Sequence, residues 1–186
     1  MKDKSICPWQ AGPMLAASTR RLIHNPDRLL RPYLAEGMMV MDIGCGMGFF
    51  TVPMAKMIGT EGRVIAVDIQ PEMLAGMVRY AGKEGVTDRV EPHLCRPDSL
   101  RTERWNCTVD FALVFMMLHE VPEQERMIRE LYNALRTGGR LLFAEPIVHV
   151  DKKRYVGELV KLKSAGFRVL TAPKISLCRS ALLERT

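Results

Sequence analysis

The feature that most restricts the fold of this sequence is a regular alternation of short apolar runs and longer amphipathic segments after residue 37. The runs have the length and composition of strands that are buried on both faces of a parallel sheet. Five such strands are predicted, at 38–44, 62–68, 88–94, 108–118 and 139–146, and helices are predicted at 49–59, 71–85, 122–139 and 152–166. This alternation predicts an α/β fold, with a central parallel sheet and helices on both faces.

The two ends of the chain depart from the alternation. Residues 167–173 and 175–185 have the character of two strands, and the chain between them is too short for a helical crossover, so we expect them to pair antiparallel. Pro92 lies inside the third predicted strand and has no amide to donate, which places that strand near an edge of the sheet. The first 37 residues are predicted to be helical and to form a lid over the core.

A glycine-rich turn follows the first predicted strand. Its sequence, "DIGCGMG" at 42–48, carries Gly44, Gly46 and Gly48 in the pattern GxGxG. A turn of this kind between a strand and a helix presents backbone amides to a ligand. The dinucleotide fingerprint is GxGxxG, and Phe49 stands here where its third glycine would be. The turn therefore favours a nucleotide-like ligand other than a dinucleotide; a tight turn without a ligand is the alternative.

Two carboxylates accompany the turn, each at the end of a predicted strand. Asp42 would crowd a pyrophosphate and suits a cationic or zwitterionic group better. Asp68 can accept hydrogen bonds from both hydroxyls of a ribose. Together they predict a ligand with a ribose and a positive charge. As an alternative, Asp68 would cap the helix that begins at Pro71.

These motifs resemble those of the class I S-adenosylmethionine-dependent methyltransferases. "DIGCGMG" is similar to the family's first motif, "VIAVDI" (64–69) to its second-strand acidic motif, and "LRTGGRLLFAEP" (135–146) to its fifth-strand segment. The resemblance covers residues 38–186 and implies a Rossmann-like three-layer sandwich, whose seven-stranded sheet has the order 3-2-1-4-5-7-6 with strand 7 antiparallel. It implies a single domain, 1–186, with the lid at 1–37 and the cofactor-binding core at 38–186. The overall form is most similar to small-molecule methyltransferases of the quinone- and arsenite-methylating type.

The resemblance also implies a cofactor, S-adenosyl-L-methionine, with S-adenosyl-L-homocysteine as its product. It implies that the residues around the cofactor are Asp42, Gly44, Cys45, Gly46, Gly48, Asp68 and Ile69, with Asp68 at the ribose and Ile69 against the adenine. The segment "CRPDSL" stands where the family often has Gly-Asp-Ala, which makes Asp98 the candidate for the adenine amino group; a cap or an exposed loop residue is its alternative. Phe115, at the end of the fourth predicted strand, is expected to line the pocket or to belong to the core.

The methyl acceptor is expected at the carboxyl ends of the fourth and fifth predicted strands, where ligands of such sheets bind. His119 is the candidate general base, because the ordinary pKa of histidine is near neutrality, and Glu120 is a candidate for orienting it or for pairing with a basic side chain. Glu145 and His149 are expected on the same rim. The alternatives are a helix-entry segment without catalytic function, and a reaction that needs no base because the acceptor is already ionised.

Three function classes remain open at this point: a small-molecule methyltransferase, an RNA or protein methyltransferase, and a cofactor-binding protein without catalysis. The net charge of +6 motivates the second class, but the basic residues are dispersed and lack interleaved aromatic residues. "FMMLHE" is also unlike the Asp/Asn-Pro-Pro-Tyr motif of amino-methylating relatives. A small-molecule acceptor is therefore favoured and nucleic acid is disfavoured as a partner.

Composition supports a globular protein, with 47% hydrophobic and 26% charged residues. The sequence contains neither an apolar run of membrane-spanning length nor a recognisable signal peptide, so we expect a cytoplasmic protein. The five cysteines have no CxxC spacing, which favours plain thiols and no metal site. Arsenite bound by Cys7, Cys95 and His149 is a minor alternative.

Overall fold

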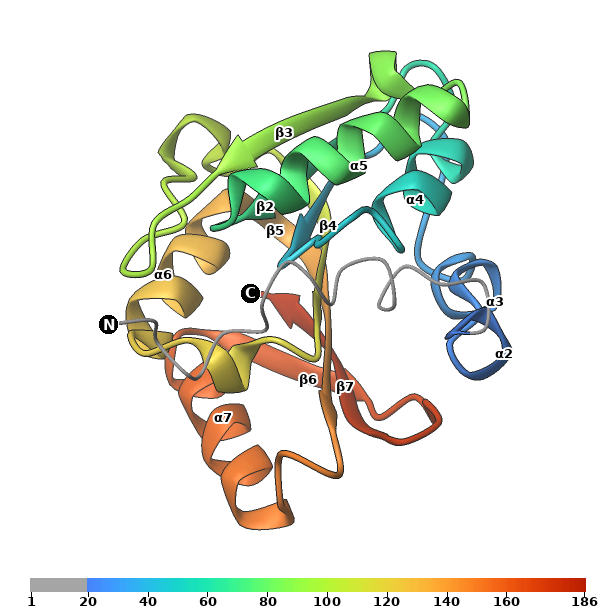
Figure 1. Ribbon diagram of the computed structural model, residues 1–186. Helices are drawn as coiled ribbons and strands as arrows, with labels where there is room; N and C mark the ends of the chain where they lie inside the picture. The colour runs from blue at the N-terminus through green and yellow to red at the C-terminus, as the bar shows by residue number, and fades with distance from the viewer. Residues whose placement is uncertain (1–19) are drawn as a thin grey trace. The chain divides into compact units, whose positions relative to one another are not determined.

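The computed structural model describes residues 20–186, and its seven strands form one sheet in the order β3-β2-β1-β4-β5-β7-β6 (Figure 1). This is the order that the resemblance implies. The chain divides into two compact units, Met1–Leu94 and Cys95–Thr186. The first unit holds the glycine turn, and the second holds His119.

The first unit contains three parallel strands and the helices that pack on them. Its elements are α2 (Arg20–Ile23), α3 (Pro26–Leu30), β1 (Met39–Ile43), α4 (Thr51–Met57), β2 (Arg63–Asp68), α5 (Pro71–Lys83), the 3₁₀ helix η2 (Thr87–Arg89) and β3 (Val90–Leu94). The side chains of Val40, Met41, Val64 and Ile65 are fully buried, as the apolar runs predict. Pro92 lies in β3, at the edge of the sheet, which confirms the prediction for the third strand.

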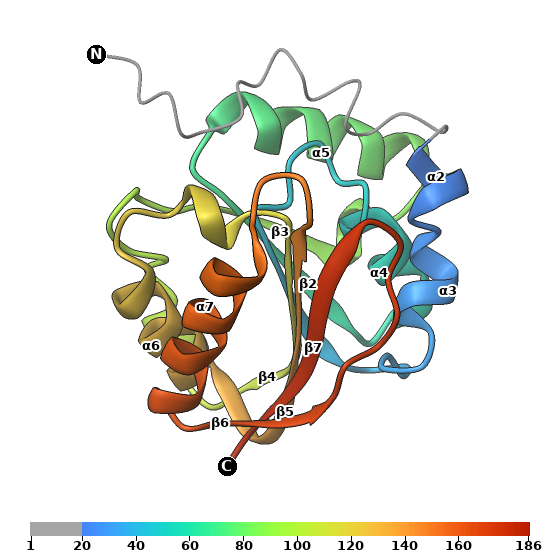
Figure 2. The same cartoon turned by 90° about the horizontal axis from the view of Figure 1, so that it is seen from below.

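The second unit contains four strands and two main helices. Its elements are the 3₁₀ helix η3 (Glu103–Trp105), β4 (Val109–Phe115), the 3₁₀ helix η4 (Leu118–Glu120), α6 (Gln124–Ala134), β5 (Leu135–Pro146), α7 (Lys152–Ser164), β6 (Phe167–Thr171) and β7 (Cys178–Arg185). β4 and β5 are parallel, whereas β7 pairs antiparallel with both β5 and β6. The closing hairpin is therefore antiparallel, as predicted, and Figure 2 shows β6 and β7 side by side with α7 beside them.

Three predicted boundaries are wrong. The helical segment predicted to reach residue 37 ends at Leu30, and the strand predicted to reach residue 118 ends at Phe115. The sequence predicts a helix to residue 139, but α6 ends at Ala134 and β5 already begins at Leu135, opposite Val109 of β4. A Cβ atom on Gly139 would lie 2.7 Å from the Arg136 carbonyl oxygen and 3.0 Å from that of Val109. The glycine therefore permits close approach of two strands, whereas the sequence pattern alone suggested a helix stop.

The predicted lid lies partly outside the described residues, which begin at Arg20. Within them, α3 begins at Pro26: Asn25 is the N-cap, its side chain accepts a hydrogen bond from the Arg28 amide, and Pro26 occupies the first turn. Leu30, at the end of α3, is fully buried.

Candidate functional site

The glycine turn of the first unit links β1 to α4 and has a left-handed backbone at each of its glycines. The φ angles of Gly44, Gly46 and Gly48 are +72°, +54° and +89°, values at which residues with a Cβ atom are strained. At Gly48 space is restricted as well, because a Cβ atom there would lie 2.9 Å from Cγ of Met77 on α5. The turn thus needs glycine at alternate positions, which explains the GxGxG pattern.

The backbone amides of this turn are hydrogen-bonded within the protein. Gly44 and Cys45 both donate to the Val67 carbonyl oxygen, at 2.8 and 3.0 Å, and Gly48 donates to the Cys45 carbonyl oxygen at 3.0 Å. Gly46 donates to Oδ2 of Asp68 at 2.9 Å. A phosphate site requires amides that point at the ligand. Since four amides of the turn already have acceptors, the turn suits a ligand without a pyrophosphate.

Asp68 ends β2 and lies beside the turn. Its Oδ2 atom accepts from Gly46, and its Oδ1 atom accepts from the Gln70 amide at 2.9 Å. Burial raises the pKa of this carboxyl, while the two amides and that of Ile69 lower it. Each carboxylate oxygen has a second lone pair available. Asp68 can therefore accept hydrogen bonds from two neighbouring hydroxyl groups, as the sequence analysis expects for a ribose.

Asp42 is the second carboxyl of this group and is 3% exposed. The Thr51 hydroxyl, from the first turn of α4, donates to its Oδ2 atom at 2.6 Å. Burial raises the pKa of Asp42 to about 6; the Thr51 hydrogen bond opposes this shift, and the charge of Asp68 adds to it. Two buried carboxyls that repel each other are stabilised by a nearby cation. This pair therefore favours a ligand with a positive charge.

Arg20 supplies part of that positive charge from α2. Its guanidinium lies 4.5 Å from the ring centroid of Phe49, which follows the glycine turn, and its charge lowers the pKa of Asp42. Arg20, the first residue that the structure describes, therefore lies close to the end of the glycine turn. Residues 1–19 lie outside the described residues, so the expectation that they cover the site as a lid stays a prediction.

Other predicted cofactor residues differ in their surroundings. Cys45 is buried, with its thiol directed to the Gly46 carbonyl oxygen, and Ile69 is half-buried. In the second unit, Phe115 is buried at the end of β4. Asp98 is exposed and lies within 4 Å of two arginines, Arg96 at 3.7 Å and Arg126 at 3.5 Å. This exposure supports the alternative that Asp98 is an exposed loop residue. Its role at the adenine stays a prediction.

The second group of residues is centred on His119, in η4. The Nδ1 atom of its ring lies 2.5 Å from Oε2 of Glu145, and its backbone amide donates to Oε1 of the same carboxylate at 3.2 Å. Glu145, near the end of β5, is fully buried. The hydrogen bond to Glu145 raises the pKa of His119, and burial of the ring opposes this increase. In a neutral ring this geometry assigns the proton to Nδ1, so Nε2 carries the free lone pair.

The four residues expected at the acceptor rim are close together in the second unit. Oε1 of Glu120 lies 3.9 Å from Nε2 of His119, and the ring of His149 stacks on His119 with centroids 5.9 Å apart and planes 8° apart. One assignment within the group needs correction. Glu120 was a candidate for orienting His119, but the carboxylate that bonds the ring nitrogen is that of Glu145.

Two residues that were not candidates in the sequence, Arg154 and Gln124, donate hydrogen bonds to carbonyl oxygens of η4. Arg154 of α7 donates to the His119 carbonyl oxygen at 2.6 Å and lies 3.6 Å from Oε1 of Glu158. Gln124 donates to the Leu118 carbonyl oxygen at 2.9 Å. Burial, together with the charge of Glu145, raises the pKa of Glu158 to about 7. Arg154 follows Lys152 and Lys153 in a basic run in which nothing distinguishes it, so the sequence held no signal for this role.

Met116 directs the chain into η4. It follows β4 directly and has a φ of +57°, although it is not glycine. Its amide donates to the Ala144 carbonyl oxygen of β5 at 2.7 Å. Left-handed backbone at a residue with a long side chain costs about 1–3 kcal/mol and persists where the surrounding structure enforces it. The strain at Met116 therefore marks the turn that carries His119 as specially constrained.

Within residues 20–186, no cluster of three or more His, Cys, Asp or Glu side chains is arranged to hold a metal ion. The same residues include no helix with the length and apolar character needed to cross a membrane.

Comparison with known proteins gives three kinds of match. A family model described as "Methyltransferase domain" matches residues 34–170. The "Ubiquinone/menaquinone biosynthesis C-methyltransferase UbiE" of Enterobacter sp. (strain 638) is 29% identical over 148 residues, which cover 73% of this chain and 58% of that protein. The protein of the same name from Salmonella arizonae is 31% identical over 123 residues, 64% of this chain and 48% of that protein. The chain thus spans about half the length of these relatives.

Solved structures match a larger share of this chain than the sequence relatives do. A crystal structure of a SAM dependent methyltransferase from Aquifex aeolicus has a TM-score of 0.87 at 25% identity and covers 97% of this chain and 100% of that one. A putative S-adenosyl-L-methionine-dependent methyltransferase from Methanococcus maripaludis has a TM-score of 0.78 at 12% identity, covering 100% of this chain and 96% of the other, and shows similarity of fold alone.

Proposed function

Because the chain belongs to the methyltransferase domain family, we propose that it is an enzyme that transfers a methyl group from S-adenosylmethionine to a small-molecule acceptor and releases S-adenosylhomocysteine. The observation that carries the proposal is the turn of the first unit. Its amides are already bonded, and two buried carboxyls lie beside it. This arrangement disfavours the pyrophosphate of NAD and favours a ligand with a ribose and a positive charge.

The residues of the first unit fit this cofactor. We assign Asp68 to the two ribose hydroxyls, since both its oxygens are held in place by backbone amides and retain free lone pairs. Asp42, buried and next to the turn, offers a negative charge to the cationic methionine part. When bound, the cofactor supplies a methyl group that is electrophilic because it is attached to a sulfonium.

In the second unit, we assign His119 as the general base. Glu145 bonds its Nδ1 atom, which leaves Nε2 to take a proton from an acceptor hydroxyl, thiol or carbon acid. The hydrogen bond that raises the pKa of His119 also makes it a stronger base. Removing the proton would leave a lone pair on the acceptor atom, available to the methyl group that a bound cofactor would supply. The reacting atoms need to be in line and about 3–3.5 Å apart.

The relatives support a small-molecule acceptor. Their names describe C-methyltransferases of ubiquinone and menaquinone biosynthesis, and a ring carbon activated by a neighbouring hydroxyl is an acceptor on which a base such as His119 can act. We also propose a cytoplasmic location. Cell fractionation tests this proposal.

The experiment has two parts, binding and turnover. Calorimetry with S-adenosylmethionine, S-adenosylhomocysteine and NAD measures cofactor preference; we expect either sulfur ligand to bind more tightly than NAD, and the reverse order rejects the assignment of the turn. Release of S-adenosylhomocysteine is then measured with a panel of hydroxylated quinone-like rings, thiols, and RNA. Turnover with RNA but with none of the small molecules would assign the chain to the nucleic-acid-modifying class. Cofactor binding without turnover on any acceptor would support a regulator.

A further inference from the structure

The positive charge of this chain is concentrated in one segment of the second unit. Residues 146–180 contain eight Lys and Arg and two acidic residues, a net charge of +6, which is the net charge of the entire chain. The segment comprises the β5–α7 loop, α7, β6, the β6–β7 loop and the start of β7. Positive charge on one set of elements attracts an anionic partner to that side of the unit.

Half of these cations have no partner within the described residues. Hydrogen bonds or ion pairs engage Arg154, Lys161, Arg168 and Arg179. The structure gives no hydrogen bond or ion pair, among residues 20–186, to the four lysines Lys152, Lys153, Lys163 and Lys174. Three of these lysines belong to α7 and are exposed.

The exposed face of α7 is apolar as well as basic. Lys152, Val156, Val160 and Lys163 follow one another at helical spacing and therefore form one stripe along the helix. Val156 is 48% exposed and Val160 is 55% exposed. A stripe with two exposed valines between two lysines is unusual on the solvent side of a helix whose other face packs on the core.

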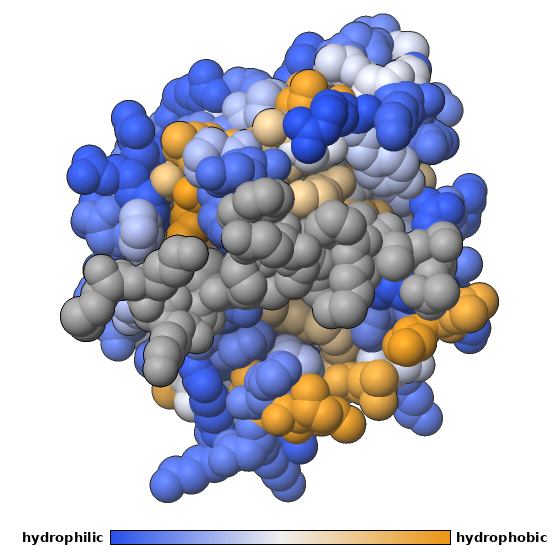
Figure 3. All heavy atoms as spheres, in the orientation of Figure 1, coloured by the Kyte–Doolittle hydropathy of each residue, from blue (hydrophilic) through white to orange (hydrophobic). Residues whose placement is uncertain are grey.

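Two loops extend the exposed apolar surface beyond α7. Val148 in the β5–α7 loop is 77% exposed, and Leu177 in the β6–β7 loop is 56% exposed. The Ile147 amide donates to the Leu177 carbonyl oxygen at 3.0 Å, which holds the two loops together. Hydrophobic side chains gather beside hydrophilic ones at the lower edge of Figure 3, where these loops lie. We refer to the α7 stripe and these loop residues as the α7 surface.

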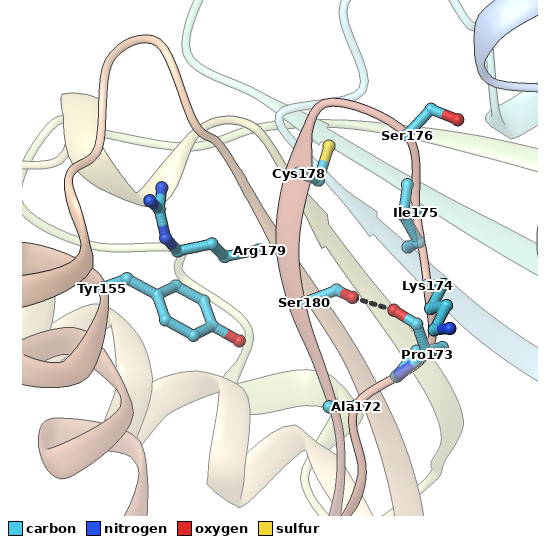
Figure 4. A pocket seen from close by; sticks show the side chains of 9 residues that line it. All are labelled: Tyr155, Ala172, Pro173, Lys174, Ile175, Ser176, Cys178, Arg179 and Ser180. Carbon is cyan, nitrogen blue, oxygen red and sulfur yellow. Dashed lines mark hydrogen bonds between the residues drawn. The ribbon is translucent and has the colours of Figure 1, made fainter.

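A small anion does not explain the α7 surface. A hollow of about 490 Å³ lies at the β6–β7 loop, lined by Tyr155, Lys174, Arg179 and neighbouring residues. Figure 4 shows Lys174 and Arg179 on opposite sides of β7, so their charged groups do not converge on one compact ligand. Arg179 is also engaged, because it donates to the Val150 carbonyl oxygen at 2.7 Å. The cations are spread over a surface, which suits an extended anionic partner.

We propose that the α7 surface binds the anionic face of a lipid bilayer. Lysines without a partner among residues 20–186, beside exposed aliphatic side chains, match the two parts of such a partner, since the lysines attract anionic headgroups and the aliphatic groups enter the interface. Single-stranded nucleic acid would require exposed rings for stacking, but Tyr155 and Phe167, the Phe, Tyr or Trp residues of this segment, are buried. Lipid therefore explains both the charge and the exposed valines.

Sedimentation of vesicles with the full-length protein tests the proposal. We expect binding to vesicles of phosphatidylcholine and phosphatidylglycerol in equal parts and little binding to phosphatidylcholine alone. The double variant Lys152→Gln with Lys163→Gln should bind about 30-fold more weakly, on the basis of about 1 kcal/mol per lysine at an anionic surface. Val148→Ser should weaken binding by about tenfold, because it removes an apolar group from the interface.

A matched control uses residues of the first unit with similar exposure. Lys83 is exposed and Leu94 is 48% exposed, so Lys83→Gln and Leu94→Ser change charge and hydropathy in the same manner outside the α7 surface. Both should bind vesicles as the unmodified protein does. The proposal is overturned if the controls lose as much binding as the α7 variants, or if the protein binds neutral vesicles equally well. It is also overturned if a short RNA displaces the protein from the vesicles and Val148→Ser does not change vesicle binding.

Discussion

The Nδ1 atom of His119 lies 2.5 Å from Oε2 of Glu145, a carboxylate that is fully buried and 26 residues further along the chain. The same carboxylate accepts the His119 backbone amide at 3.2 Å. One side chain of β5 thus fixes both the ring and the backbone of the candidate base. Such a pairing determines which ring nitrogen carries the proton, and it strengthens the base.

We predict that Glu145→Gln lowers the pKa of His119 and therefore shifts the pH profile of turnover. A general base acts in its deprotonated form, so activity rises with pH through the pKa of His119. This pKa is raised mainly by the hydrogen bond to Glu145, and its loss should move the rising limb to lower pH and reduce the maximal rate by about 10²-fold or more. Initial rates measured across a pH series check both effects.

The matched comparison is Glu120→Gln. Glu120 is 3.9 Å from the other ring nitrogen and makes a smaller contribution to the His119 pKa. A larger shift of the profile in Glu120→Gln than in Glu145→Gln would return the orienting role to Glu120.

We predict that Asp68→Ala weakens binding of S-adenosylmethionine. A hydrogen bond to a charged group contributes about 1.5–3 kcal/mol, so the loss of one ribose contact should raise the dissociation constant by roughly 10- to 100-fold. Calorimetry measures the change, with Asp88→Ala as the control, since the Asp88 side chain is 66% exposed in the same unit. Affinity that is unchanged in Asp68→Ala rejects the ribose assignment.

We predict that Asp42→Asn stabilises the protein at neutral pH while weakening cofactor binding. Burial raises the pKa of Asp42 to about 6 from an ordinary value of 3.8, so the folded protein holds this proton more tightly than the unfolded chain does. The unfolding free energy therefore falls as the pH rises from about 4 to about 6. The Asp42→Asn variant does not lose this unfolding free energy. The difference in unfolding free energy between the variant and the unmodified protein should therefore grow through that window to about 2–3 kcal/mol and then stay constant. Urea unfolding at several pH values gives the curve, and an advantage independent of pH contradicts the assignment.

We predict that Gly46 and Gly48, two of the three glycines of the turn, differ in their tolerance of alanine. Both have positive φ, which costs a residue with a Cβ atom about 1–2 kcal/mol. At Gly46 nothing lies within 4 Å of the added atom, whereas at Gly48 it would lie 2.9 Å from Cγ of Met77. Gly48→Ala should thus destabilise by about 1–3 kcal/mol more than Gly46→Ala. Thermal unfolding of the two variants makes the comparison, and equal melting temperatures would show that Met77 yields without cost.

We predict that deletion of residues 1–20 leaves a folded core that has lost methyl transfer. The deletion removes Arg20, which lies over Phe49 and lowers the pKa of Asp42. Circular dichroism measures folding and S-adenosylhomocysteine release measures activity. The point variant Arg20→Ala separates the contribution of this one cation from that of the rest of the segment; full activity in the deletion would exclude the lid.

The sequence alone determined the strand–helix alternation, the antiparallel hairpin and the glycine turn, because each depends on residues close together in the chain. Apolar runs of strand length must be buried on both faces, and GxGxG marks a backbone that only glycine adopts without strain. Asp42 and Asp68 were identified for the same reason, since each stands at the end of its strand.

The tertiary structure alone decided which side chains act together. Glu145 rather than Glu120 bonds His119, because the parallel pairing of β4 and β5 sets Phe115 opposite Ala144 and so places the residues after Phe115 next to Glu145. Arg154 reaches the His119 backbone from α7, and the Gly139 backbone approaches Val109 instead of ending a helix. Contacts between residues distant in sequence follow from strand register and helix packing, which local patterns do not encode.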